Sequence, residues 1–235
     1  MSPESTTAVT ANIPVIAVDG PSGAGKGTIA HMLAGTLGWH LLDSGALYRV
    51  VGHACVLEEV SWDDHAAVTD VARHLDVAFN ATSSGEVEVV YRGVNVSREI
   101  RTEEGGLGAS RVAVIPSVRD ALLARQREMR RAPGLVADGR DMGTVVFADA
   151  PLKFFLTASA EERAQRRHKQ LMDKGESVSL PRLLEEIRDR DERDSTREAS
   201  PLVPAEDAIA IDSTATPIAE VFEQVMQAVR DRGLG

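Results

Sequence analysis

Residues 20–28, which read GPSGAGKGT, constrain the fold of this chain more than any other segment. They follow the short apolar run 13–19, which we expect to be a buried parallel strand. They precede residues 27–38, whose apolar residues have helical spacing. A strand, a glycine loop and a helix in this order allow backbone N–H groups and a helix N-terminus to surround a phosphate. The alternative is a glycine turn that only packs strand on helix, but the flanking elements favour a phosphate-binding loop.

The loop departs from the usual signature at one position. Gly27 follows Lys26, where Ser or Thr is usual, and the hydroxyl comes one residue later, at Thr28. Lys26 is expected to hold the outer phosphates as a mobile point charge. The Gly-Lys-Gly-Thr order resembles the loops of nucleoside monophosphate kinases. That resemblance implies that the loop is intact and that the Thr28 hydroxyl lies near phosphate and a magnesium ion, directly or through water.

The rest of the chain alternates short apolar runs with helical patterns, which predicts a parallel α/β sheet. Besides 13–19, the expected strands are residues 39–43, 134–139, 152–158 and 208–213. Besides 27–38, the expected helices are residues 45–59, 116–131, 160–174, 180–197 and 217–232.

Residues 74–97 break this alternation. Apolar and polar residues alternate there around Ser-Ser-Gly and Arg-Gly turns, which predicts a small antiparallel meander inserted into the α/β chain. The segment SWDD that begins at Ser61 predicts a helix start directly after that serine.

Composition limits the class of partner. The chain has 235 residues and a net charge of −10, so its surface repels a nucleic-acid backbone and no polymeric partner is expected. No apolar run is long enough for a membrane span, and residues 1–12 are expected to be a disordered leader without a secretory signal. The single cysteine, Cys55, fits a reducing compartment and is expected to pack in the core. These features predict a cytoplasmic protein.

Two classes of nucleotide-binding protein then remain to be compared. A regulatory GTPase needs Asp-x-x-Gly and Asn-Lys-x-Asp motifs, and neither string occurs in the sequence. A small-molecule kinase needs several arginines close together to neutralise two sets of phosphates. Candidate segments follow two of the expected strands, DSGALYR at 43–49 and DGRDMGTVVF at 138–147, at the sheet edge where ligands bind.

A third arginine-rich segment, residues 188–197, lies on an expected helix. Arg190, Asp194 and Arg197 stand at i, i+4 and i+7 and therefore share one face. The alternative for this segment is a solvated, self-paired helix surface. Arg163 and Arg167 have the same i, i+4 relation and the same alternative.

Four segments together resemble the bacterial cytidylate kinase family, and the likeness extends over about residues 13–212. They are GPSGAGKGT, HLLDSGALYR, PGLVADGRDMGTVVF and RDRDERDSTREASPLVPA. The resemblance implies a P-loop NTPase fold of the nucleoside monophosphate kinase type, as one domain over residues 13–235. It also implies an acceptor-binding insertion at about 61–110 and a lid at about 170–200. The implied reaction is transfer of the γ-phosphoryl group of ATP to CMP or dCMP with Mg²⁺.

The resemblance also implies roles for individual residues. ATP would be bound by Gly20, Pro21, Ser22, Gly23, Ala24, Gly25, Lys26, Gly27, Thr28, Arg163 and Arg167. The acceptor would be bound by Ser44, Arg49, Ser110, Arg119, Arg140, Asp141, Arg190, Asp194 and Arg197. Catalysis would depend on the positive charges of Lys26, Arg140, Arg190 and Arg197.

Asp141 is the natural residue to discriminate between bases. A carboxylate accepts a hydrogen bond from the amino group of cytosine and repels the carbonyl that uracil has in its place. The alternative is that Asp141 only orients Arg119 or Arg140. Two other functions stay open at this stage: a kinase for another acceptor such as UMP, shikimate or gluconate, and a nucleotide-sensing switch. We expect a monomer whose partners are small molecules.

Overall fold

A computed structural model describes residues 13–81, 87–173 and 175–234 of the chain. They form two compact units: unit 1 is made of the described residues up to Leu42 and from Met129 onward, and unit 2 is made of those from Asp43 to Glu128. The expected leader, residues 1–12, and the Ser-Ser-Gly turn of the meander lie outside the described residues. No described helix combines the length and the apolar character that a membrane span needs.

Unit 1 is built on a parallel sheet, which confirms the predicted α/β class. Its strands have the order β2-β6-β1-β7-β8. Their bounds are β1 Val15–Asp19, β2 His40–Asp43, β6 Leu135–Asp138, β7 Leu152–Thr157 and β8 Ile209–Asp212. All five strands were predicted, because each is a short apolar run that ends at a polar residue or a glycine.

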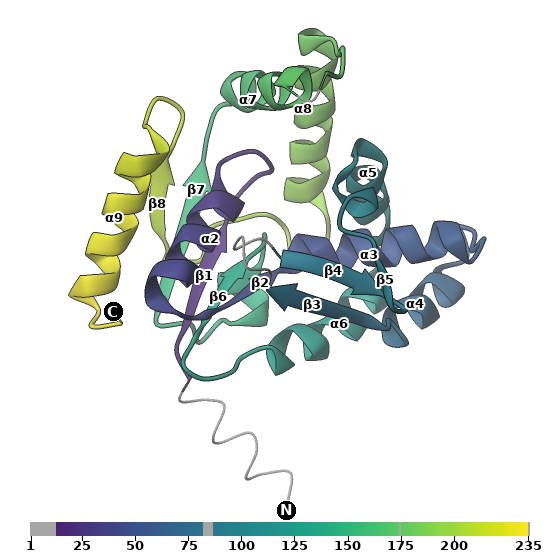
Figure 1. Ribbon diagram of the computed structural model, residues 1–235, viewed down its shortest axis with the longest axis horizontal. Coiled ribbons are helices and arrows are strands. Elements are labelled where there is room, and N and C mark those ends of the chain that lie inside the picture. The colour runs from purple at the N-terminus through teal and green to yellow at the C-terminus, as the bar shows by residue number, and fades with distance from the viewer. Residues whose placement is uncertain (1–12, 82–86, 174, 235) are drawn as a thin grey trace, which may run out of the picture. The chain divides into compact units, whose positions relative to one another are not determined.

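Helices α2 (Lys26–Leu37) and α9 (Ile218–Asp231) lie side by side along this sheet (Figure 1). Ile29 and Leu33 of α2 and Val225 of α9 belong to the same buried cluster as the apolar side chains of the strands. This packing fixes the start of α2, and therefore the glycine loop, against the carboxyl end of β1.

Helices α7 (Ala160–Asp173) and α8 (Leu180–Thr196) also belong to unit 1 and pack against each other. Helix α8 is one residue shorter than predicted: Arg197 has extended backbone angles, φ −61° and ψ 140°. Gly175, in the connection between the two helices, has φ +82°. The residue range of the predicted lid, about 170–200, includes this connection and α8. The lid itself stays a prediction.

Unit 2 contains the antiparallel meander, as predicted. Its strands pair in the order β3-β4-β5, with Val77 opposite Tyr91 and Val90 opposite Asn95. The elements of unit 2 are α3 Ser44–Leu57, α4 His65–Arg73, β3 Val77–Ala81, β4 Val87–Tyr91, β5 Val94–Asn95, the short helix Glu99–Arg101, α5 Glu103–Val112 and α6 Pro116–Glu128.

Two local predictions in unit 2 need correction. The helix expected directly after Ser61 begins only at His65, because the Asp64 carboxylate accepts the Ala67 N–H at 2.9 Å and caps the helix there. Helix α5 was not predicted, since three glycines weaken its helical pattern. One of them allows a close helix crossing: a Cβ at Gly52 of α3 would stand 2.9 Å from the Gly108 backbone.

Candidate active site

The glycine loop connects β1 to α2, as its sequence predicts. Gly20 has φ +141°, and a Cβ at this position would meet the Leu156 carbonyl oxygen at 2.0 Å, so only glycine fits. Lys26 is the first residue of α2 and is only 8% exposed. Its Nζ donates a hydrogen bond to the Pro21 carbonyl at 2.8 Å, so the lysine side chain folds back over the loop.

Lys26 lies among groups of both charges. Burial lowers the pKa of Lys26, and the carboxylates of Asp138 and Asp19 act in the opposite direction. Arg140 and Arg190 also act on this lysine and lower its pKa. Three predicted cationic residues, Lys26, Arg140 and Arg190, are therefore close enough to interact within unit 1.

Asp138 belongs to this site, although the sequence analysis did not single it out. It ends β6, directly beside β1 in the sheet, with Val18 opposite Asp138 in the register. A Cβ at Gly27 would stand 3.3 Å from its Oδ2 atom, so the carboxylate lies against the glycine that follows Lys26. The signal available in the sequence was its place at the carboxyl end of a buried apolar strand.

The side-chain oxygens of Thr28 and Asp138 suit a magnesium ion. Thr28 is exposed in the first turn of α2, and the Asp138 carboxylate lies beside Gly27. Mg²⁺ typically takes one or two protein ligands and completes its shell with phosphate oxygens and water. The described residues hold no group of three or more His, Cys, Asp or Glu side chains arranged for a metal, and a magnesium–nucleotide site does not need one.

Arginines gather around a second carboxylate, Asp194 of α8. Arg140 Nε donates to Asp194 Oδ2 at 2.5 Å, and Arg197 Nη1 lies 3.7 Å from Asp194 Oδ1. Burial alone would raise the pKa of Asp194, but Arg140, Arg190 and Arg197 together hold it below its usual value. Arg190 and Arg197 therefore both lie near Asp194, although Arg197 stands just beyond the end of the helix and not on its predicted face, and Arg140 joins them from the segment after β6. We call these four residues the Asp194 cluster.

Asp141 follows Arg140 and is 4% exposed. It begins a single π-helical turn, Met142–Val146, and its carbonyl accepts the N–H groups of Val145 and Val146 at 2.9 and 3.1 Å. The N–H groups of Met142 and Gly143 point instead to the carboxylate of Asp19, the last residue of β1. Isolated π-helical turns occur frequently at functional sites, but the residue pattern does not predict one here.

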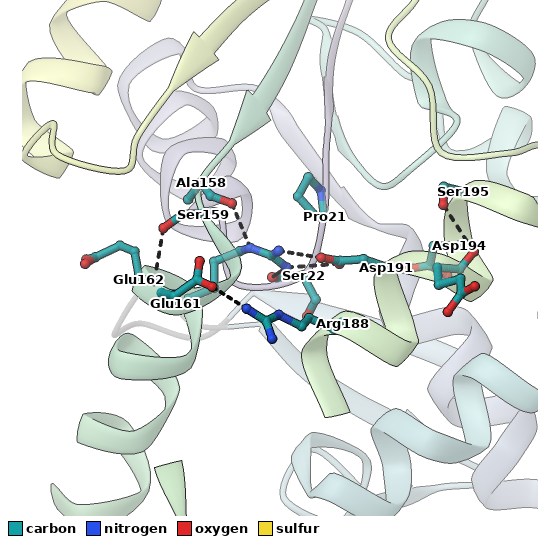
Figure 2. A network of polar contacts seen from close by, with 12 residues as sticks. Pro21, Ser22, Ala158, Ser159, Glu161, Glu162, Arg188, Asp191, Asp194 and Ser195 are labelled. Carbon is teal, nitrogen blue, oxygen red and sulfur yellow. Dashed lines mark hydrogen bonds and ion pairs between the residues drawn. The ribbon is translucent and has the colours of Figure 1, made fainter. Parts of the chain in front are cut away.

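Arg163 of α7 contacts both α8 and the glycine loop, and Figure 2 labels three of its partners, Ala158, Ser22 and Asp191. Its Nε donates to the Ala158 carbonyl at 2.9 Å, and its Nη1 donates to the Ser22 carbonyl at 3.1 Å. Both of its terminal nitrogens also bond the Asp191 carboxylate. Each nitrogen of this guanidinium thus has a partner within the chain, and one of those partners is a loop residue.

Two further arginines lie near Arg163 on α7, Arg166 and Arg167. Arg167, one turn further along α7, is half-buried. Arg166, which the sequence analysis did not select, donates to the Ser213 carbonyl at 2.5 Å. The Ser213 hydroxyl in turn donates to the Ala24 carbonyl of the loop at 3.0 Å.

The remaining predicted acceptor residues lie in unit 2. Ser44, the first residue of α3, donates to Gln126 Oε1 at 2.7 Å, and Arg49 Nη1 donates to the Ile100 carbonyl at 2.9 Å. Arg119 is 8% exposed, and its guanidinium carbon lies 5.5 Å from the Tyr48 ring centre. Ser110 is half-buried on α5, the helix that the Gly52–Gly108 crossing brings against α3.

Comparison with known proteins places this chain among enzymes of one kind. The family model described as cytidylate kinase matches residues 16–231. A cytidylate kinase of Stutzerimonas stutzeri is 56% identical over 223 residues, which cover 94% of this chain and 97% of the relative. Cytidylate kinases of Shewanella frigidimarina and Klebsiella pneumoniae are 58% and 55% identical and cover 92% and 95% of the chain, and 95% and 98% of their own lengths.

Proposed function

Since this chain belongs to the cytidylate kinase family and catalyses the ATP-dependent phosphorylation of CMP, we propose a division of that work among its residues. In the reaction the bond between the γ-phosphorus and its bridging oxygen breaks, which leaves ADP. A new bond forms between the γ-phosphorus and an oxygen of the CMP phosphate, which gives CDP. The acceptor is already an anion, so the protein supplies alignment and positive charge rather than a strong base.

The glycine loop binds the phosphates of ATP in this proposal. Backbone N–H groups of residues 20–28 and the N-terminus of α2 surround them, and Lys26 exchanges its bond to the Pro21 carbonyl for a phosphate oxygen. Thr28 and Asp138 would hold Mg²⁺, directly or through water, and the ion when bound neutralises negative charge on the transferred group. Arg167 covers ATP, whereas Arg163 fixes the loop through the Ser22 carbonyl.

The Asp194 cluster contacts the acceptor and the transferred phosphoryl group. Three arginines face one carboxylate, so the cluster carries more positive than negative charge, which suits phosphates. Asp194 accepts a hydrogen bond from a sugar hydroxyl of CMP and keeps the arginines in place. The convergence of Arg140, Arg190 and Arg197 on Asp194, with Arg140 and Arg190 also acting on Lys26, is the single observation that carries the proposal.

Asp141 and residues of unit 2 recognise the acceptor's base and phosphate. We assign the cytosine amino group to Asp141 and the rest of the base to Ser110 and Arg119. Ser44 and Arg49 contact the CMP phosphate. In this proposal dCMP is a second substrate, the enzyme is a cytoplasmic monomer, and residues 13–235 act as one kinase domain with the acceptor insertion and lid expected from the sequence.

The assignment is tested by measuring ADP release with CMP, dCMP, UMP, AMP and shikimate for the wild type and Asp141→Asn. We expect the wild type to prefer CMP, because a site built on buried hydrogen bonds rejects a mismatched analogue by up to about 10⁴-fold. In Asp141→Asn, we expect kcat/KM for CMP to fall. The difference between kcat/KM for CMP and kcat/KM for UMP should also become smaller, because an amide presents either a donor or an acceptor. An equal fall for both nucleotides would make Asp141 an orienting residue instead.

A further inference from the structure

The carboxylate of Asp19 is joined to the segment that carries Arg140 and Asp141. Asp19 ends β1 and is 4% exposed. Its Oδ1 accepts the Met142 N–H at 2.9 Å, and its Oδ2 accepts the Gly143 N–H at 2.7 Å. These are the first two N–H groups of the π-helical turn Met142–Val146, and groups at a helix start have no partner within the helix.

We propose that Asp19 is a positioning residue for CMP recognition: its carboxylate caps the π-helical turn from a distant strand and thereby holds Arg140 and Asp141 where they meet the acceptor. The proposal rests on the function proposed above, in which both residues contact CMP. Asp19 itself touches no substrate in this scheme. It acts by fixing the backbone immediately after Asp141.

Only an ionised carboxylate satisfies both donors at once. Each of its oxygens accepts one N–H, and a charged acceptor makes these bonds stronger than neutral ones. An asparagine keeps the shape but has one accepting oxygen, and its amide N–H₂ would face a backbone N–H. The site is too buried for water to replace the lost acceptor freely, so one donor would be left without a partner.

The charged groups around Asp19 do not replace this function. Lys26 and Asp141 are the charged groups that act on Asp19 itself, and Asp138, Arg140 and Arg190 act in turn on Lys26. Lys153 of β7 also lies close to the turn. A Cβ at Gly143 would stand 3.0 Å from Lys153 Cδ and 3.3 Å from Asp19 Oδ2. Lys153 Nζ donates to the Ala148 carbonyl and to Asp207 Oδ1, and Lys26 Nζ donates to the Pro21 carbonyl. Among the described hydrogen bonds, the donors to the Asp19 carboxylate are therefore the Met142 and Gly143 N–H groups of the turn, and neither lysine takes their place.

The other side of the turn is already fixed. The Asp141 carbonyl accepts the Val145 and Val146 N–H groups, so the end of the turn is closed within the segment itself. Without Asp19 the start of the turn is open, and the peptide that follows Asp141 can rotate. A change there moves the Asp141 side chain more than the glycine loop, whose geometry depends on Gly20 and Lys26.

The test combines hydrogen exchange with kinetics on Asp19→Asn. We expect faster deuterium uptake in the peptide that covers residues 139–147, whether or not the assigned substrate roles are correct. We also expect kcat/KM for CMP to fall about 10²-fold, the cost of a misplacement of about 1 Å. Because UMP should lose less than CMP, the ratio of kcat/KM for CMP to kcat/KM for UMP should fall about tenfold or more. The KM for ATP should change little.

Two further variants keep the test decisive. Gly143→Ala perturbs the same bond from the other partner, because its Cβ would stand 3.3 Å from Asp19 Oδ2, and it should give a smaller change in the same direction. It replaces Asp19→Asn if that variant does not fold. Asp64→Asn is the matched control, since Asp64 also accepts a backbone N–H at a helix start but lies in unit 2; its CMP/UMP ratio should equal that of the wild type.

Three results would overturn the proposal: unchanged exchange in residues 139–147, faster exchange with an unchanged CMP/UMP ratio, or an equal loss of affinity for ATP and CMP. A wild type that does not prefer CMP would instead count against the proposed base recognition, and the exchange result would still report on the cap itself.

Discussion

Two of the aspartates on helix α8, Asp191 and Asp194, lie less than one turn apart, and each is paired with an arginine from another segment of unit 1. Asp191 binds Arg163 of α7, and Asp194 binds Arg140 from the segment after β6 (Figure 2 shows both aspartates). The two pairs have similar chemistry but different surroundings. Arg163 gives all its nitrogens to protein oxygens, two of which are the Ala158 and Ser22 carbonyls.

The charge balance separates the two pairs. Arg163 and Asp191 neutralise each other, so their contact joins α7, α8 and the glycine loop without attracting a further anion. Asp194 is shared by Arg140, Arg190 and Arg197, three positive charges against one negative. In the proposed function the saturated pair holds structure together, whereas the cluster, in which three arginines share one carboxylate, binds phosphate. The difference lies in how many arginines share each aspartate, not in the type of ion pair.

The largest expected effect comes from removing one positive charge from the Asp194 cluster. We expect Arg190→Met to lower kcat about 10²–10³-fold, because a cation at the developing charge of the transition state is lost. The melting temperature should change little, since one of three mutually repelling arginines is removed. Steady-state kinetics with CMP and ATP, together with thermal unfolding, measures both.

The matched control for this variant is Arg193→Met, at an exposed position of the same helix. It should keep the wild-type rate. Near-normal turnover in Arg190→Met would mean that the cluster, like the other pair, serves structure alone.

The second prediction reverses the first. Arg163→Met should lower the free energy of unfolding by about 3 kcal/mol, the lower end for breaking a buried pair, because the Asp191 side chain is 30% exposed and keeps some hydration. Urea unfolding measures this loss. The kcat of the folded fraction should fall less than in Arg190→Met. A stable variant with the larger rate loss would show that Arg163 contacts ATP directly.

The third prediction uses pH to separate Asp194 from Asp19, another of the buried carboxylates. Burial raises the pKa of Asp19 to about 6, against two backbone hydrogen bonds that lower it. The folded state then binds this proton more tightly than the unfolded state, so stability falls as pH rises through about 6. Between pH 7 and pH 5 the free energy of unfolding should rise by about 1 kcal/mol from this group.

The contribution of Asp194 to the free energy of unfolding depends on pH in the opposite direction. Its pKa is lowered, so its stabilising contribution is complete above the ordinary carboxyl value of 3.8 and is lost only in more acidic solution. Urea unfolding of Asp19→Asn should therefore lack the rise between pH 7 and pH 5, and Asp194→Asn should retain it. A rise that persists in Asp19→Asn would assign the effect to another group.

The smallest effect is expected at the exposed pair Arg188–Glu161, which joins α8 to α7 at 2.6 Å with side chains 60% and 54% exposed. Arg188→Ala should leave the melting temperature and kcat unchanged, because exposed ion pairs contribute little that can be measured. A clear loss of stability would show that the contact between α7 and α8 depends on surface charge as well as on the Arg163–Asp191 pair.

Much of this architecture was predictable from short-range patterns. The five parallel strands and the meander follow apolar runs and alternation, and helical spacing was enough to predict that Arg190 and Arg197 lie near Asp194. Family resemblance supplied Arg140 as an acceptor-binding and catalytic residue, but its pairing with Asp194 was not predicted. Each of the predicted features depends on residues a few positions apart or on a motif with fixed spacing.

The features that were missed depend on partners far apart in sequence. Helix α5 contains three glycines and is stabilised by tertiary packing, which the sequence pattern does not reveal. Asp19 and Asp138 join the site only because β1 and β6 are neighbours in the sheet. The saturation of Arg163 depends on Asp191, Ser22 and Ala158 meeting around one guanidinium, and a lone i, i+4 arginine pair gives no sign of that.

The strand order of unit 1 has a consequence for synthesis of the chain on the ribosome. Strand β1 sits between β6 and β7 in the sheet, yet all of Asp43–Glu128 is translated before either neighbour appears. Unit 2 is continuous in sequence, so it can fold while β1 still has unpaired edges, in keeping with the tendency of domains to fold as units during synthesis. The glycine loop gains its Ser213 contact only after β8 emerges. A nascent chain stalled before β8 therefore has a complete unit 2 and an unfinished ATP site.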